Sequence, residues 1–326
     1  MFLEVQTPGK VMLVGEYVAL KGAPVLSVAV GPGLKVIVET QPTNHWVVSS
    51  ELWKKPRTLS LLENCPDHAK EPLLACLWEV ASLAKQNGGT LRVESSICVE
   101  DGMGSSSALR LAVASAFSKL ADLEFDPLRL AWEWQRKSQK HASGYDVITQ
   151  YHGGCLKMED LHDQQSWPGL IQKFDLKPLI DQLHLWCGGV GAPTGPVMKD
   201  TMAWLDTKPS RWDKLQDASR RLTESLEKAS THGLWEDCYV DCGRHRQCFE
   251  GSPHYPQRVA DQLDSCEGVD KKWSYKFTGA GGEDAILMMG DKISVKHPSA
   301  LLTSLGWKKT DKKFSDDGIQ VKVRKS

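Results

Sequence analysis

Short apolar runs separated by turn residues dominate the first 40 positions of the chain. Residues 11–14 and 25–30 are almost wholly apolar, and residues 34–39 alternate loosely and are rich in β-branched side chains. The residues between them include Gly15, Gly22, Pro24, Gly31, Pro32 and Gly33. Such runs between glycine and proline are typical of β-strands joined by turns. We therefore expect three short strands in this region.

Helical periodicity follows in three stretches of the first half, residues 69–86, 105–120 and 126–141. The last stretch opens with Asp126-Pro127, a capping residue followed by proline at the first helical position. Residues 90–99 have the composition of another strand. This mixture predicts helices packed against a sheet.

The second half of the chain also contains both strand and helix patterns. We expect strands at residues 183–187, 273–277 and 285–289, and helices at 211–228, 234–249 and 256–263. The polar stretch 160–168 is the preferred boundary between two domains, because a chain of 326 residues is long enough for two.

Composition narrows the functional classes. The 40 basic and 41 acidic side chains give a net charge of −1, without the basic excess of nucleic-acid-binding proteins. No apolar run reaches the length of a membrane span. The first residues lack the pattern of a signal peptide, and nine scattered cysteines are an odd number. We therefore expect a cytoplasmic protein with free thiols that binds neither nucleic acid nor membrane.

One group of side chains raises the question of zinc. Cys238, Cys242, His245 and Cys248 recur on one face of a predicted helix. The paired C-x2-C spacing of structural zinc sites is absent, so buried thiols on a helix are the favoured interpretation, and zinc is the alternative.

Glycine and small hydroxyl residues gather at residues 7–17, 102–109 and 278–282. In the second stretch two glycines precede three serines that open a helix. Free backbone N–H groups at a helix start favour phosphate, whereas an ordinary serine cap is the alternative. The chain lacks the P-loop, dinucleotide-binding, G-x-S-x-G, H-E-x-x-H and protein-kinase motifs.

Four segments, taken in order, resemble the motifs of the GHMP kinases, a family that includes galactokinase, homoserine kinase, mevalonate kinase and phosphomevalonate kinase. They are residues 8–17, 102–108, 143–154 and 276–282. The second resembles the family's phosphate loop. The third, which begins Ser-Gly-Tyr-Asp, is similar to a segment of the mevalonate and phosphomevalonate kinases. Together the matches extend over nearly the whole chain.

The resemblance implies an α+β fold of two domains. Residues 1–165 would form the ATP-binding GHMP kinase N-terminal domain, which resembles domain 2 of ribosomal protein S5. Residues 166–326 would form a ferredoxin-like C-terminal domain, with the active site in the cleft between the two.

The same resemblance assigns roles to individual residues, with ATP as the phosphoryl donor and Mg²⁺ beside it. Asp146 would accept the proton of the substrate hydroxyl, and Lys10 would stabilise negative charge. By residue pattern alone, Lys10 would be a surface ion pair and Asp146 a helix cap. The resemblance predicts that the nucleotide phosphates contact Gly102, Gly104, Ser105, Ser106 and Ser107, with Ser106 also binding Mg²⁺. It predicts that the substrate contacts Tyr17, Ser143, Gly144, Thr278, Gly279, Ala280 and Gly281.

The predicted substrate is 5-phosphomevalonate, converted to 5-diphosphomevalonate in isoprenoid biosynthesis, because Tyr17 after Gly-Glu resembles the phosphomevalonate kinases. Mevalonate or another small alcohol is the alternative, and an inactive ligand sensor or regulatory partner is a different class. A homodimer is compatible with the resemblance. Cations that could meet a second phosphate are Arg110, Lys137, Lys140, His141 and Lys199. The chain departs from the family at Gln135, near the offset of a second Mg²⁺ carboxylate, and at Glu283.

Overall fold

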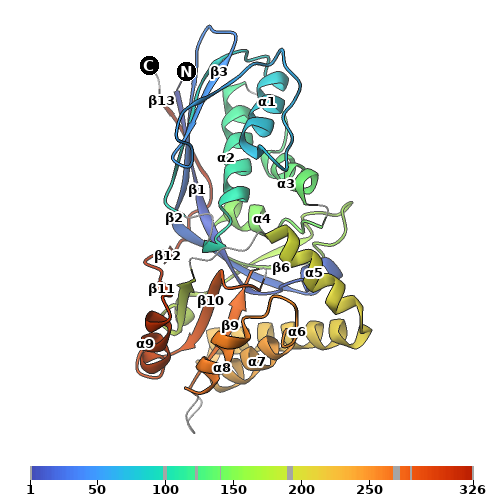
Figure 1. Cartoon of the computed structure of the whole chain (residues 1–326), viewed down its shortest axis with the longest axis vertical. Coiled ribbons are helices and arrows are strands. Elements are labelled where there is room, and N and C mark those ends of the chain that lie inside the picture. The colour runs from blue at the N-terminus through green and yellow to red at the C-terminus, as the bar shows by residue number, and fades with distance from the viewer. Residues whose placement is uncertain are drawn as a thin grey trace.

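The computed structural model describes residues 2–97, 101–121, 124–139, 141–188, 194–266, 272–279 and 281–324. In the upper half of Figure 1 one sheet stands with helices at its side, and in the lower half a second sheet has helices mainly below it. No helix within those ranges is both long and apolar enough to cross a bilayer. The cysteines that the structure describes are all free thiols.

The larger sheet has the order β13-β1-β2-β5-β3-β4, with β6 and β12 paired to β2 and β7 paired to β6. Its strands are β1 (Phe2–Val14), β2 (Val25–Thr40), β3 (Trp46–Ser50), β4 (Arg57–Leu59), β5 (Gly89–Ser95), β6 (Cys155–Glu159), β7 (Leu170–Phe174), β12 (Lys313–Phe314) and β13 (Gln320–Arg324). A short 3₁₀ helix, Val18–Lys21, follows β1.

The expected break in β2 does not occur. Residues 25–30 and 34–39 belong to one strand, which pairs with β1 on both sides of Gly31-Pro32-Gly33. A register shift between Thr7 and Gly9 of β1 accommodates the irregularity. A Cβ on Gly33 would lie 2.1 Å from the carbonyl oxygen of Thr7, so this glycine permits a close approach of the two strands.

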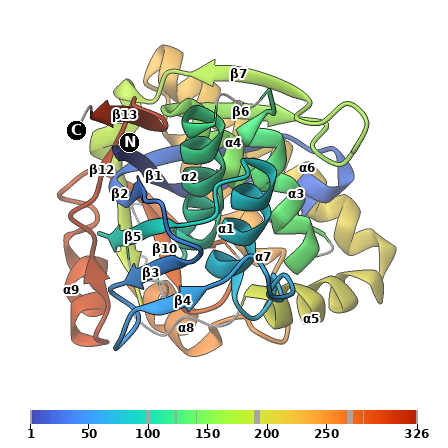
Figure 2. The same cartoon turned by 90° about the horizontal axis from the view of Figure 1, so that it is seen from above.

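Four helices accompany this sheet, and from above α1, α2 and α3 lie side by side (Figure 2). They are α1 (Pro72–Leu83), α2 (Ser105–Leu120), α3 (Pro127–Ser138) and α4 (Tyr145–His152). α2 has the predicted bounds. Asp126 caps α3 as predicted, because its Oδ1 accepts a hydrogen bond from the amide of Leu128 at 2.9 Å.

The second sheet is antiparallel with the order β11-β8-β10-β9. Its strands are β8 (Leu183–Cys187), β9 (Trp273–Thr278), β10 (Ala285–Gly290) and β11 (Lys308–Lys309). The helices are α5 (Thr194–Asp206), α6 (Pro209–His232), α7 (Glu236–Gln247), α8 (Gln257–Asp264) and α9 (Lys296–Ser304), with a 3₁₀ helix at Lys177–Gln182. In chain order the strands read 4-1-3-2, the split βαβ arrangement of ferredoxin-like folds. The predicted α+β class is confirmed.

The two sheets share a hydrophobic core. Val11 and Leu26, from β1 and β2, belong to the same buried cluster as Leu185 of β8, Leu222 of α6 and Leu287 of β10. In addition, β7, β12 and β13 come from the second half of the chain but join the first sheet. The division into residues 1–165 and 166–326 stays a prediction, and the second half contributes to both sheets.

Candidate active site

A cavity of about 220 Å³ opens between the loops and helices of the first sheet and the loops of the second. Its lining includes the predicted residues Lys10, Tyr17, Gly102, Gly104, Ser105, Ser106, Ser107, Ser143, Gly144, Asp146 and Gly279. Thr278 instead is buried and donates to the carbonyl of Met12 at 2.5 Å. Gly281 lines a smaller neighbouring cavity, and Ala280 lies outside the described residues. The structure thus brings most of the predicted site together.

The loop before α2 presents backbone N–H groups to this cavity. Gly102 and Gly104 have φ of 65° and 75°, and α2 begins at Ser105. The first amides of a helix lack intrahelical acceptors, and the helix dipole adds partial positive charge there. The start of α2 is therefore suited to phosphate oxygens, as the sequence predicts.

Both the backbone angle φ and the close neighbours of residue 104 require glycine at this position. A Cβ there would lie 2.9 Å from both Cε of Lys10 and Oγ of Ser107. The carbonyl of Gly104 accepts hydrogen bonds from Ser107 Oγ and from Nε2 of Gln150, each at 2.9 Å. These contacts fix the loop against β1 and α4.

Lys10 is buried on β1 and is tied to the same loop. Its Nζ donates to the carbonyl of Gly102 at 2.8 Å, and its amide donates to the carbonyl of Met103 at 2.9 Å. Nζ also lies 5.3 Å from the centre of the Tyr145 ring. Burial alone would lower the pKa of Lys10, but Tyr145, Asp146 and Asp284 together raise it above its ordinary value. Lys10 therefore carries a positive charge inside the cavity.

Asp146 is buried in the first turn of α4. Its Oδ2 accepts a hydrogen bond from Nε2 of Gln135 at 2.7 Å, and its Oδ1 accepts one from the amide of Val147 at 3.0 Å. A helix N-terminus favours an ionised carboxylate. The arrangement holds an acceptor for a proton next to Lys10.

Two stacked tryptophans hold the loop that leads to Asp146. The rings of Trp132 and Trp167 lie 4.3 Å apart at an angle of 4°. Their Nε1 atoms donate to the carbonyls of Ala142, at 3.1 Å, and Ser143, at 2.9 Å. Gly144, with φ of 80°, backs onto both rings, and a Cβ there would lie 2.5 Å from Cδ1 of Trp132. The predicted Ser143 and Gly144 thus position the loop through their backbone.

Ser106, the predicted Mg²⁺ ligand, does not fit that role in this arrangement. Its hydroxyl accepts a short hydrogen bond from the Arg110 guanidinium, and two cations at one oxygen would repel each other. The offset expected for a second carboxylate holds Gln135, whose amide is bound to Asp146. While Arg110 is bound to the Ser106 hydroxyl, Ser106 and Gln135 do not form a Mg²⁺ site. The role of Ser106 as a metal ligand stays a prediction.

The cations predicted to meet a second phosphate do not all lie at the cavity. Arg110 and His141 line the cavity, whereas Lys137 is paired with Glu79 at 2.6 Å and Lys199 is exposed outside the lining. Lys140 lies outside the described residues. Glu283, which would repel a ligand, is exposed and is not part of the cavity lining, whereas its neighbour Asp284 lines the wall.

A buried ion pair joins the first and last of the predicted motifs. The Lys276 ammonium contacts the Glu16 carboxylate, and neither side chain is more than 2 % exposed. Nε2 of His245 lies 3.6 Å from the other Glu16 oxygen. Burial and Lys276 hold the pKa of His245 well below its ordinary value. His245, Cys238 and Cys242 are buried on α7, in line with the interpretation as buried helix residues. Cys248, at the C-terminal end of α7, is only half-buried.

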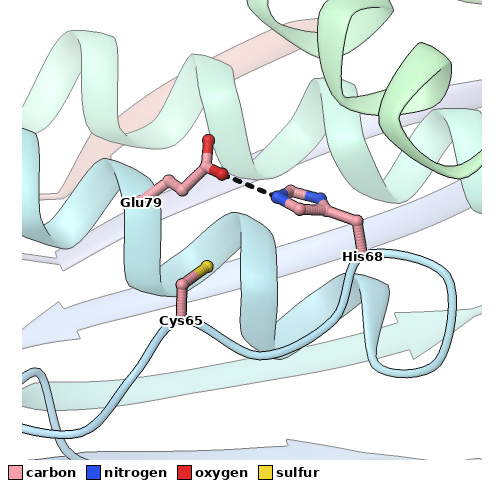
Figure 3. A group of neighbouring side chains, drawn as sticks. All are labelled: Cys65, His68 and Glu79. Carbon is pink, nitrogen blue, oxygen red and sulfur yellow. Dashed lines mark hydrogen bonds and ion pairs between the residues drawn. The ribbon is translucent and has the colours of Figure 1, made fainter.

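Within the residues described, potential metal ligands gather elsewhere, at Cys65, His68 and Glu79 (Figure 3). Nε2 of His68 lies 2.7 Å from Glu79 Oε1. The Glu79 carboxylate also accepts from Lys137 Nζ and from Trp134 Nε1, each at 2.6 Å. Because Lys137 supplies the positive charge here, the cluster is explained as a network that fastens α1 to α3.

Sequence reasoning did not assign roles to Tyr145, which contacts Lys10, or to Gln150, which donates to the loop at Gly104. It also assigned none to Asp284, whose charge acts on Lys10. Tyr145 and Gln150 lie within a motif already singled out, and Gln150 follows Asp146 at helical i+4 spacing, so a signal was available for Gln150. Asp284 had no comparable signal, because it follows a glycine-rich turn beside a second acidic residue.

Comparison with known proteins gives a consistent picture of the fold. Residues 72–154 match the family model of the GHMP kinases N terminal domain. A mevalonate kinase from Aeropyrum pernix is 30 % identical over 160 residues, which are 46 % of this chain and 48 % of that protein. The match therefore spans about half the length of this curated relative.

Solved structures extend the likeness over the whole chain. A phosphomevalonate kinase from Streptococcus pneumoniae, in complex with phosphomevalonate and AMPPNP, has a TM-score of 0.74 at 17 % identity, over 95 % of this chain and 99 % of that one. A galactokinase from Lactococcus lactis, complexed with galactose, has a TM-score of 0.74 at 11 % identity, over 98 % and 95 %. At these identities the structures show a common fold.

Proposed function

We propose that this chain, which has a GHMP kinase N-terminal domain within the fold of the GHMP kinases, is an ATP-dependent kinase of a small acidic metabolite. The observation that carries the proposal is the cavity onto which the phosphate loop, Lys10 and Asp146 all face. A phosphate-binding loop, a fixed cation and a proton acceptor are the parts that phosphoryl transfer needs.

In the proposed reaction, the N–H groups at the start of α2 bind the nucleotide phosphates. With an alcohol acceptor, the Asp146 carboxylate accepts the proton of the substrate hydroxyl as that oxygen attacks the terminal phosphorus and ADP leaves. With 5-phosphomevalonate the attacking atom is a phosphate oxygen that is already ionised near pH 7, so the step needs no proton acceptor. Gln135 keeps Asp146 turned into the cavity through the 2.7 Å hydrogen bond. Lys10 stabilises the negative charge that the transferred group carries.

For the acceptor, 5-phosphomevalonate stays the first candidate, with Tyr17 at the cavity wall as the residue that suggests it. Mevalonate is the second candidate, and a specific finding favours it, because the Aeropyrum pernix relative is a mevalonate kinase. Asp146 also suits an alcohol better than a phosphate, since a phosphate oxygen is already ionised near pH 7. An inactive sensor is less well supported, because Lys10 and Asp146 are both present.

The test is an ADP-release assay with Mg-ATP, run separately with mevalonate and with 5-phosphomevalonate. Turnover with one acceptor identifies the substrate, and the Lys10→Ala variant is expected to lose it. Binding of ATP without turnover on either compound, or on a panel of small alcohols and sugars, would contradict the proposed kinase and favour the sensor.

A further inference from the structure

Arg110 is a buried charge at the edge of the cavity. It lies on α2, five residues after Ser105, and is only 4 % exposed, yet its side chain is part of the cavity lining. In the part of the chain that the structure describes, no ion pair includes Arg110. A buried charge without a counter-ion costs several kcal/mol, so such a residue calls for an explanation.

The hydrogen bonds of Arg110 do not supply that explanation. One terminal nitrogen donates to the backbone carbonyl of Ser106, at 3.1 Å, and to the Ser106 hydroxyl. The other donates to the hydroxyl of Ser138 at 2.9 Å. These acceptors are neutral, and Nε is buried without a partner. The guanidinium is therefore held in place by neutral groups. The Asp146 carboxylate acts on its charge from a distance, without an ion pair between the two in the described residues.

The position of Arg110 indicates what would neutralise it. It bridges the phosphate loop, at Ser106, and the C-terminal end of α3, at Ser138. Gln135, the partner of Asp146, lies one turn before Ser138 on α3. Arg110 thus lies between the loop that would bind the donor and the carboxylate that would serve the acceptor. A guanidinium fork is well suited to two oxygens of one anionic group.

We propose that Arg110 binds an oxyanion of the ligand in this cavity, beside Ser106. The inference rests on the proposed function. The oxyanion has two sources in that reaction, the terminal phosphates of the nucleotide or the acidic group of the acceptor. In either case Arg110 supplies positive charge at the hydroxyl to which the family resemblance assigns a metal ion.

The experiment measures dissociation constants by calorimetry for ADP, mevalonate and 5-phosphomevalonate, each in EDTA and in Mg²⁺. The variants are Arg110→Gln and, as a matched loss of one charge, Arg258→Gln, which changes an exposed residue on α8. Loss of hydrogen bonds to a charged group is expected to weaken binding by about 10- to 100-fold in Arg110→Gln. Arg258→Gln is expected to match the wild type.

The ligand that loses affinity identifies the source of the oxyanion. A loss with ADP assigns Arg110 to the nucleotide phosphates, and a loss restricted to an acceptor assigns it to that compound's acidic group. Affinities in Arg110→Gln equal to those in Arg258→Gln for all three ligands would overturn the inference. A wild-type protein that binds no nucleotide would overturn the proposed function instead.

A second variant covers failure of Arg110→Gln to fold, which circular dichroism would reveal. Arg110→Lys keeps the buried positive charge but lacks the planar fork, so about a 10-fold weakening of the same ligand is expected. An unchanged affinity in a folded Arg110→Lys protein would argue that two-pronged binding by arginine is not used.

Discussion

Gln135 and Asp146 form a buried pair in which the amide of one donates to the carboxylate of the other at 2.7 Å. The two residues come from different helices, α3 and α4, and both line the candidate active site. A neutral amide donor adds no second negative charge beside Asp146, whereas a second carboxylate at that distance would force the pair to share a proton. If Asp146 is the proposed base, we expect Gln135 to influence how readily it accepts a proton.

Replacing Asp146 by asparagine is expected to remove the proton acceptor while keeping the shape of the side chain. If Asp146 is the general base, kcat should fall by about 10²- to 10⁴-fold, with little change in nucleotide affinity. The control is Glu133→Gln on α3, because Glu133 is exposed and paired with Arg129 at 3.1 Å. A kcat for Asp146→Asn similar to that of Glu133→Gln would exclude Asp146 from the mechanism.

Gln135→Glu is expected to change the pH dependence of turnover. The new carboxylate would face Asp146 and raise the pKa of the coupled pair, because two adjacent negative charges repel each other. The acid limb of the kcat profile should therefore move to higher pH by a unit or more. Gln139→Glu adds the same charge to the cavity wall and is the control. Identical profiles for the two variants would show that the pair does not govern the base.

Gly104→Ala tests the phosphate loop. The added methyl would meet Lys10 and Ser107 at 2.9 Å, and φ of 75° is unfavourable for alanine. We expect nucleotide affinity to fall by at least about 10-fold, since the backbone at residue 104 is strained and the side chains of Lys10 and Ser107 must shift. Gly195→Ala is the matched control, because nothing lies within 4 Å of the Cβ position there. Calorimetry with ADP measures both variants, and equal affinities would contradict the assigned role of the loop.

The ion pair of Glu16 and Lys276 predicts a strong effect on stability. Lys276→Met leaves the Glu16 carboxylate buried without its partner, and breaking such a pair costs about 3–5 kcal/mol of unfolding free energy. The double variant Glu16→Leu with Lys276→Met removes both charges and should be destabilised less than the two single changes added together. Urea denaturation checks this, and additive losses would show that the two charges are not coupled.

The Glu79 network predicts a stability that depends on acid pH. Burial alone would raise the pKa of Glu79, but hydrogen bonds from His68, Lys137 and Trp134 lower it to about 2, from an ordinary value of 4.5. Because the folded pKa is the lower one, the stabilisation is complete above pH 4.5 and is lost as the pH falls toward 2. At neutral pH it amounts to up to about 3 kcal/mol.

Glu79→Gln should therefore be less stable than the wild type at pH 7 and nearly as stable at pH 2.5, as measured by urea denaturation. Glu71→Gln is the control, since its partner Arg57 is exposed and surface pairs contribute little. A difference between wild type and Glu79→Gln that is the same at both pH values would contradict the assigned pKa.

Local signals in the sequence determined the parts of this fold that depend on neighbouring residues. The start of α2 at Ser105 and the cap of α3 at Asp126 follow from glycine, serine and proline within one turn, so both were predictable. The motif order also predicted that Lys10, Asp146 and the loop at residues 102–107 would meet. Those residues do face one cavity.

Only the tertiary structure decided the contacts between segments far apart in the chain. β2 continues through Gly31-Pro32-Gly33 because β1 pairs with it on both sides, a stabilisation that no local pattern records. The burial of Arg110 against Ser138 and the pairing of Glu16 with Lys276 depend in the same way on how helices and sheets pack. The sequence alone shows which charged residues are present. The packing of helices and sheets decides which of these charges are buried away from water and therefore need a hydrogen-bonding or charged partner.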